Sequence, residues 1–204
     1  MFTEYEVATL VEIPNIKASV LEVKEAFIKA EAQLLEISDH DFLSLIMMTP
    51  PVGVALSNGS VSLFEEMALN KMARKMSKGG YFLKQDPVAH AMTYLIKNFD
   101  QWEETFLKTI RICMDETFDV KDNSVESDHN MDQDPVESFA KDLMGTPYIF
   151  VRFLSSFFLH EEAEIVDSRS ISKVEFEKIH DIGRKLGIEK IPVFRSFCRT
   201  FNVR

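Results

Sequence analysis

Cysteine is scarce in this sequence, and long hydrophobic runs are missing. Two cysteines among 204 residues do not make a disulfide framework, on which small secreted domains with an insufficient core depend. No segment reaches the roughly 18 consecutive apolar residues of a membrane-spanning helix. The first residues, which include Glu4, carry no signal-peptide pattern. We therefore expect a reduced, cytoplasmic protein with no membrane partner.

Basic residues are also in short supply. The chain has 23 Lys and Arg against 33 Asp and Glu, which gives a formal net charge of -10. Binding to phosphates requires an electropositive surface, so we do not expect nucleic acid to be the main partner.

The charge is distributed unevenly along the chain. Residues 115–137 contain nine acids and one Lys, whereas residues 184–204 contain six basic residues and one acid. Opposite charge allows these two segments to meet, within one chain or between two copies, in a contact that salt would weaken. Arg195, Arg199 and Arg204 are therefore candidate partner-binding residues.

Tryptophan occurs once and tyrosine four times, whereas phenylalanine occurs 17 times. Phe buries a large apolar area and has no polar group, so we expect these rings in the core rather than on a recognition surface. The single Trp102 lies within 86–118, where apolar residues recur at helical spacing. This stretch predicts one long kinked helix, or two consecutive helices with a break at 98–100.

Helix starts recur along the chain as capping boxes, in which a side-chain oxygen and a Glu three residues later bind amides of the first turn. Five pairs have this spacing: Thr3 and Glu6, Ser19 and Glu22, Ser62 and Glu65, Asp100 and Glu103, and Ser172 and Glu175. Each lies next to an apolar pattern of helical period. Together they predict an all-α fold, a compact bundle of about seven to nine helices with no significant sheet.

Several segments allow two interpretations. Residues 3–13 fit a helix or a strand, and the alternation around Asn58-Gly59 fits a β-hairpin or an irregular loop. The double proline at 50–51 predicts the end of a helix that begins after Ser38. Residues 63–76 are apolar on nearly all sides and predict a buried helix. The Met residues there and nearby are expected to fill the core, with an adaptable binding groove as the alternative.

Composition divides the chain into three parts. A helical part at 1–118 and a second helical part at 135–204 flank an acidic linker or long loop at 119–134, which has no apolar period. The C-terminal part is too short to bury an adequate core of its own. We therefore expect the two helical parts to pack together as one structural unit.

No catalytic motif is complete. The sequence lacks a Gly-rich phosphate loop, a Ser nucleophile elbow and a Cys-x-x-Cys pair. His180 precedes an Asp, as in the dipeptide of a class of metallohydrolases, but no later Asp completes that site. Glu177 and His180 have the spacing of a di-iron motif, of which the chain contains only one. Glu161 and Glu164 follow a His but lack the second His of a zinc protease.

Cys198 has two interpretations. It lies between Arg195 and Arg199, and nearby cations lower the pKa of a thiol and make it reactive. It also lies on an apolar stripe with Phe194 and Phe197, which favours a buried structural cysteine. We expect the second.

Three functions stay open. Incomplete motifs and abundant apolar helical surface favour a non-catalytic interaction or regulatory protein that binds a protein partner or itself, without a cofactor. The first alternative is a metal-dependent enzyme whose site is assembled from Glu161, Glu164, Glu177 and His180. The second is a carrier of an apolar ligand in a pocket between Phe-rich helices.

Overall fold

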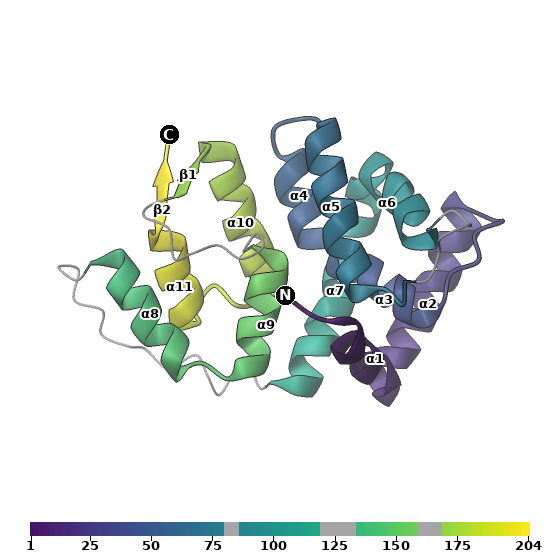
Figure 1. Cartoon of the computed structure of the whole chain (residues 1–204), viewed down its shortest axis with the longest axis horizontal. Helices are drawn as coiled ribbons and strands as arrows, with labels where there is room; N and C mark the ends of the chain where they lie inside the picture. Colours follow the sequence, from purple (N-terminus) through teal and green to yellow (C-terminus); the bar gives the residue numbers. More distant parts are fainter. Residues whose placement is uncertain (80–85, 119–133, 159–168) are drawn as a thin grey trace.

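The computed structural model describes residues 1–79, 86–118, 134–158 and 169–204. Within these ranges the helices are α1 Glu4–Glu12, α2 Pro14–Glu31, α3 Asp39–Met47, α4 Thr49–Leu56, α5 Leu63–Met76, α6 Pro87–Lys97, α7 Phe99–Thr117, α8 Pro135–Gly145, α9 Tyr148–Phe157, α10 Lys173–Lys185 and α11 Pro192–Arg199, and the strands are β1 Arg169–Ile171 and β2 Phe201–Val203. Helices α1 to α7 lie on one side of the molecule, and α8 to α11 with both strands lie on the other (Figure 1). In these four ranges no helix combines the length and the apolar composition that crossing a membrane requires.

The all-α expectation is confirmed for the described residues, but these form more helices than the seven to nine expected. Residues 3–13 contain helix α1 rather than a strand. The unexpected helix is α4, which the segment Thr49-Pro50-Pro51 opens, although it was expected only to end the helix before it. Proline suits this position because the first turn of a helix leaves its N–H groups unbonded, so the missing N–H costs nothing there.

Of the two interpretations of the segment around Asn58-Gly59, the structure contains the irregular loop and not the β-hairpin. Residues up to Leu56 belong to α4, and Gly59, with φ at 95°, lies in the turn that joins α4 to α5. Within the described residues the strands are β1 and β2 alone, which pair in parallel with Ser170 opposite Asn202. Each strand has three residues, so the sheet is a small addition to a helical fold.

Three of the five expected capping boxes are present, those that begin at Thr3, Ser62 and Ser172. The other two are wrong. Ser19 lies inside α2, which already begins at Pro14, and Asp100 lies in the first turn of α7, whose N-cap is Asn98. The break at Asn98 confirms two consecutive helices within 86–118.

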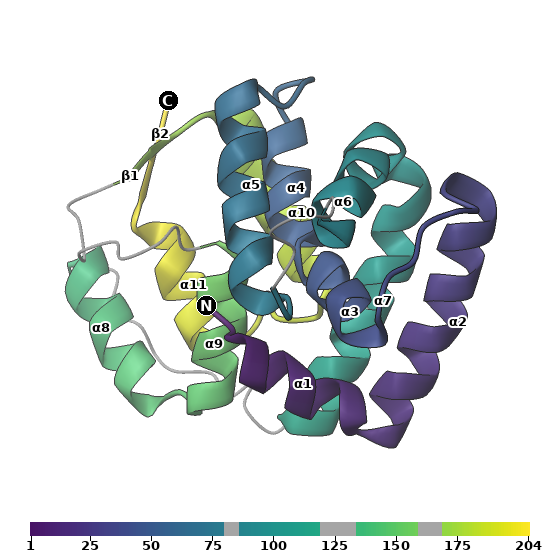
Figure 2. The ribbon, with the colours of Figure 1, turned by 45° about the vertical axis from the view of Figure 1, so that its right-hand side comes forward.

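The centre of the N-terminal part is α3, in which every residue from His40 to Met47 is buried. Helices α1, α2, α6 and α7 pack around it (Figure 2). Aromatic rings fill the space between α2, α3 and α7. The centroids of Phe27 and Trp102 are 5.0 Å apart, and those of Phe42 and Phe106 are 5.7 Å apart. Both pairs are edge-to-face, a geometry that adds about 0.5–1.5 kcal/mol beyond area burial.

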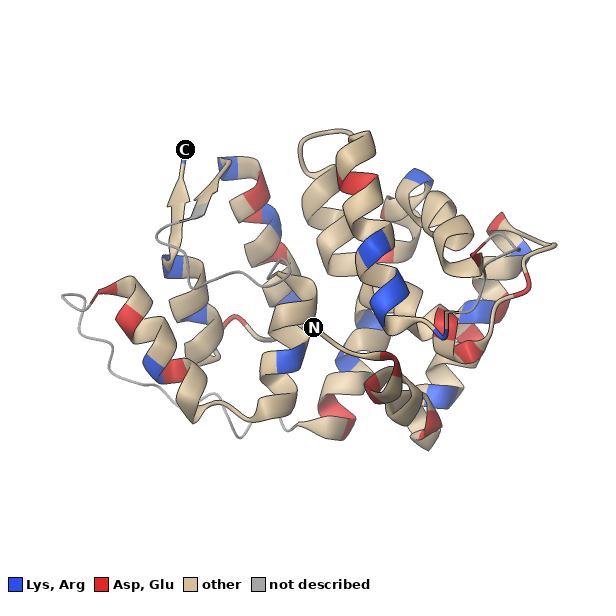
Figure 3. Ribbon diagram, viewed as in Figure 1, with Lys and Arg blue, Asp and Glu red and all other residues tan. Residues whose placement is uncertain are grey.

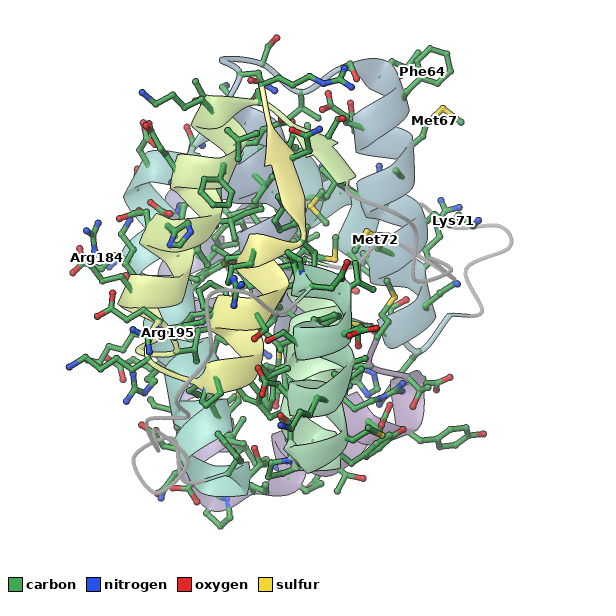
Figure 4. The ribbon with its side chains drawn as sticks, turned by 90° about the vertical axis from the view of Figure 1, so that its left-hand side faces the viewer. Phe64, Met67, Lys71, Met72, Arg184 and Arg195 are labelled. Carbon is green, nitrogen blue, oxygen red and sulfur yellow. The ribbon has the colours of Figure 1, made fainter. Side chains whose placement is uncertain are left out.

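Helix α5 has the predicted span but is not buried all round. Leu69 and Met72 face the core, whereas the exposed fractions of Phe64 and Met67 are 84% and 62%. Figure 4 shows Phe64 and Met67 projecting away from the molecule. Leu63, Phe64 and Met67, in the first two turns of α5, are therefore exposed apolar residues. Met76 and the Met residues of α3 and α6 are buried and fill the core.

Side chains from the two helical parts meet along α9. Arg152 on α9 donates from Nε to Oε1 of Glu6 on α1, at 2.9 Å, and from Nη2 to Oε2 at 2.5 Å. Phe118, at the end of α7, stacks on Phe150 of α9 with ring centroids 4.9 Å apart. Buried residues of both parts form one hydrophobic cluster.

Candidate binding site

A surface hollow of about 640 Å³ lies between α10 and α11. We call it the cationic hollow. It is lined by Phe176, His180, Glu189, Lys190, Phe194, Arg195, Cys198, Arg199 and Phe201. Three of these residues are basic and one is acidic, in a chain whose acids outnumber its bases by ten.

Two helices and the tight turn between them bring these side chains together. Phe176 and His180 are four residues apart on α10, and Arg195 and Arg199 are four apart on α11, so each pair shares one helix face. The chain reverses between the helices at Gly187, whose φ of 73° suits glycine because it has no Cβ. This turn places one face of each helix around the same hollow.

The two helices also pack closely behind the hollow. At Gly183 on α10, a Cβ atom would lie 2.3 Å from the ring of Phe194 on α11. Glycine is therefore required there for the ring to approach the α10 backbone. That ring is part of the lining of the hollow.

The cations of the hollow have no acidic partner in the part of the chain that the structure describes. Within the described residues, Lys190, Arg195 and Arg199 form no ion pair. By contrast, Arg184 and Lys185, at the end of α10, both form ion pairs with Asp181. Basic residues mark both α10 and α11 in Figure 3, and Figure 4 shows Arg184 and Arg195 on the same side of the molecule. The hollow is therefore a locally electropositive site on an acidic protein.

Aromatic rings form the apolar part of the hollow. The His180 ring lies 4.6 Å from the Phe176 ring and 6.3 Å from the Phe194 ring, centroid to centroid, both edge-to-face. The ring centroid of Phe201, at the start of β2, lies 6.2 Å from that of Phe176. Among the described residues, rings contact the His180 side chain and no carboxylate binds it. A general base usually has a group that fixes its tautomer.

Burial makes Cys198 unreactive. Its exposed fraction is 4%, and burial raises the pKa of its thiol to about 12. The neighbouring Arg195 and Arg199 do not offset this effect. The structure therefore confirms a structural cysteine rather than a low-pKa nucleophile. Burial likewise raises the pKa of Cys113, on α7, to about 12.

The metal-site candidates are only partly within the described residues. Glu161 and Glu164 lie outside them. Glu177 is on α10 and forms a surface ion pair with Lys173 at 3.7 Å. Among the described residues, no group of three or more His, Cys, Asp and Glu side chains is arranged to hold a metal ion. The proposed metal set is therefore not tested as a whole.

The partner-binding candidates divide into two groups. Arg195 and Arg199 lie in the cationic hollow, together with His180 from the metal set. Arg204 follows β2 and does not line the hollow; its backbone N–H donates to the carbonyl of Ile171. The sequence reasoning missed the contribution of Lys190. Its position in a basic segment was visible, but its place in the hollow depends on the turn at 186–191.

The chain matches no protein-family model, no curated protein and no solved structure. A function therefore has to be inferred from the side chains of the hollow and from the chemistry that they allow.

Proposed function

We propose that this protein is a non-catalytic, cytoplasmic interaction protein whose cationic hollow binds a carboxylate-rich segment of a partner protein. One observation carries the proposal. Lys190, Arg195 and Arg199 converge on one hollow without an ion pair among the described residues, although the chain has a net charge of -10.

The chemistry of the cations supports a carboxylate ligand. The guanidinium of an Arg presents parallel N–H groups that match the two oxygens of a carboxylate. Arg195 and Arg199, one turn apart, can each bind a different acidic side chain of an extended or helical segment. Phe176 and Phe201 add apolar contact area beside the charged groups, as in protein interfaces that combine Arg with aromatic residues.

The surroundings of the hollow support a protein partner over nucleic acid. A nucleic-acid surface needs basic residues along a stripe or face, because affinity comes from several phosphate contacts. Here the hollow is lined by only three of the 23 Lys and Arg residues, and the chain as a whole carries an acidic excess. The long-range field would therefore repel a polyanion, while a short acidic segment is attracted locally.

A binding role also suits the side chains better than catalysis. The thiol of Cys198 has a pKa raised to about 12, so it supplies no nucleophile at neutral pH. The two cysteines of the chain are buried and not paired with each other, so the fold does not depend on an oxidising compartment.

A peptide titration tests the proposal. The probe is a synthetic peptide with the sequence of residues 119–134 of this chain, which contains six acids and one Lys. We expect saturable binding to the full-length protein that weakens as salt is added, because exposed ion pairs are screened. The same peptide with its acids replaced by amides is expected not to bind. Equal binding of both peptides would exclude carboxylate recognition.

Matched variants locate the binding site. The double variant Arg195→Gln and Arg199→Gln should weaken binding roughly tenfold, because each exposed ion pair contributes up to about 1 kcal/mol. Arg184→Gln removes the same charge from the same side of the molecule, outside the hollow, and should change the affinity less than twofold. Equal effects of the two changes, or tighter binding of a DNA duplex than of the peptide, would contradict the proposal.

A further inference from the structure

A second hollow, the apolar cleft, lies between the two helical parts. Its volume is about 260 Å³. Helices α4 and α5 form one wall, and α9, α10 and the two strands form the other. Its apolar lining includes Val54, Leu69, Met72, Phe157, Ile179 and Phe201. In Figure 4, Met72 lies on the inner side of α5, whereas the exposed Phe64 and Met67 project from its outer side.

Among the described residues, the ionisable side chains that line the cleft are two acids, Glu65 and Glu175, and the lining contains no Lys, Arg or His. Each acid belongs to a capping box. Oε2 of Glu65 accepts the backbone N–H of Ser62 at 2.7 Å, and Oε2 of Glu175 accepts that of Ser172 at 2.9 Å. Within the described residues, Oε1 of each carboxylate accepts no hydrogen bond.

The capping geometry keeps both carboxylates in place. Hydrogen bonds from the side chain and backbone of Ser62 hold the pKa of Glu65 below its ordinary value. The two helix starts are also connected, since Ser172 Oγ donates to Oδ1 of Asn58, in the turn before α5, at 3.4 Å. The cleft therefore combines apolar walls with two fixed negative groups that retain an unused acceptor oxygen.

From this geometry we infer that the apolar cleft is a binding site for a small amphiphile with a hydrocarbon body and an ammonium group. The volume sets the size of the body. A dry cavity of about 150 Å³ holds a benzene molecule, and pockets for drug-sized ligands begin near 300 Å³. The charge sets the head group, because Glu65 and Glu175 attract an ammonium group and repel a carboxylate. We therefore expect a fatty acid to bind more weakly than an amine with the same alkyl chain.

Three probes with one alkyl chain test the site. Octylamine, octanol and octanoic acid are titrated into the full-length protein by calorimetry at neutral pH. We expect saturable binding in the order amine, alcohol, acid, with the amine preferred to the alcohol by roughly three- to thirtyfold, as two partly exposed ion pairs allow. Absence of saturable amine binding, or binding of the acid as tight as that of the amine, would overturn the inference.

Two kinds of variant separate the charge from the cavity. Glu65→Gln with Glu175→Gln preserves both capping boxes, because Gln also fills the third helical position. It should reduce the preference for amine over alcohol to less than about twofold and leave alcohol binding unchanged. Ala68→Phe, at an exposed lining position of α5, should fill the cleft and abolish binding of amine and alcohol.

The apolar cleft and the cationic hollow share Phe201 in their linings but use different charged residues. The double variant Arg195→Gln and Arg199→Gln should bind octylamine as the unaltered protein does, and Glu65→Gln with Glu175→Gln should bind the acidic peptide unchanged. If the charge-neutral cleft variant kept the full amine preference, the carboxylates would not be the recognition groups and the inference would fail.

Discussion

Glu103 on α7 and Lys178 on α10 form an ion pair across the two helical parts, with Oε1 and Nζ 2.7 Å apart. Lys185, two turns further along α10, donates from Nζ to the other oxygen, Oε2, at 2.9 Å. The exposed fraction of Glu103 is 8%, so this carboxylate is buried and depends on both lysines for its charge balance. Lys178 Nζ also lies 5.4 Å from the centroid of the Phe99 ring.

The variant Glu103→Gln should therefore lower the free energy of unfolding by about 1–2 kcal/mol. Breaking a fully buried pair costs about 3–5 kcal/mol, but Lys185 is more than a third exposed, so water compensates part of the loss. Urea unfolding followed by circular dichroism measures the change. Glu104→Gln is the matched control, since Glu104 is exposed, and it should stay within about 0.5 kcal/mol. Equal losses in both variants would mean that the pairs do not join the two parts.

The ion pair between Glu6 and Arg152 should make stability depend on pH. Burial alone would raise the pKa of Glu6, but hydrogen bonds from Arg152 and Thr3 outweigh it and hold the pKa below its ordinary value of 4.5. A depressed pKa in the folded state contributes stability that is complete above the ordinary value and is lost as the pH falls through the folded value. Glu6→Gln should thus cost about 1 kcal/mol at neutral pH, and this cost should shrink as the pH falls below 4.5 through the folded pKa.

Urea unfolding at a series of pH values checks this difference. Gln at position 6 retains the capping box with Thr3, so the comparison isolates the charge. Glu12→Gln removes an exposed surface pair with Lys17 and should show a smaller effect at neutral pH. A constant difference between Glu6→Gln and the unaltered protein across the whole range would contradict the assigned pKa direction.

Local rules predicted much of the helical structure, and their failures have physical causes. The capping box at Ser62 was identified from sequence because all its hydrogen bonds lie within four residues. The same pattern at Ser19 failed because Pro14 had already started the helix, and a Ser and Glu three apart also occur within helices. The double proline at 50–51 was interpreted as a stop, although it equally suits a helix start.

Long-range pairings could not be predicted in this way. Glu103 was assigned to a capping box, whereas it binds Lys178, which lies 75 residues later in the chain. The spacing of Arg195 and Arg199 was visible in the sequence and placed both on one face of a helix. Their convergence with His180 and Lys190 depends on the reversal at 186–191, for which the sequence offered only a Gly.

The close packing of α10 on α11 should not tolerate a methyl group at Gly183. In Gly183→Ala the new Cβ would lie 2.3 Å from Cζ of Phe194, so the ring must move. Overpacking of this kind costs about 1–3 kcal/mol in the free energy of unfolding. Gly145→Ala, at the end of α8, is the control, because a Cβ there meets no atom of the protein within 4 Å. It should be neutral or stabilising by up to about 1 kcal/mol. Thermal unfolding of both variants measures these changes. Equal stability of Gly183→Ala and the unaltered protein would show that the Phe194 ring can move without a loss of stability.

If the carboxylate-rich segment that fills the cationic hollow is residues 119–134 of a second copy, the protein should self-associate in a salt-dependent manner. Sedimentation velocity at low and high salt measures this for the unaltered protein and for a chain that lacks 121–133. This deletion removes four of the six acids of the peptide probe together with its Lys and leaves only Asp119 and Asp134. We expect a larger species for the unaltered protein at low salt alone, because high salt screens the pairs. Arg195→Gln with Arg199→Gln should abolish that species as the deletion does, whereas Arg184→Gln should retain it. Identical sedimentation of all four proteins at both salt concentrations would exclude a second copy as the partner and leave a different acidic protein as the occupant of the hollow.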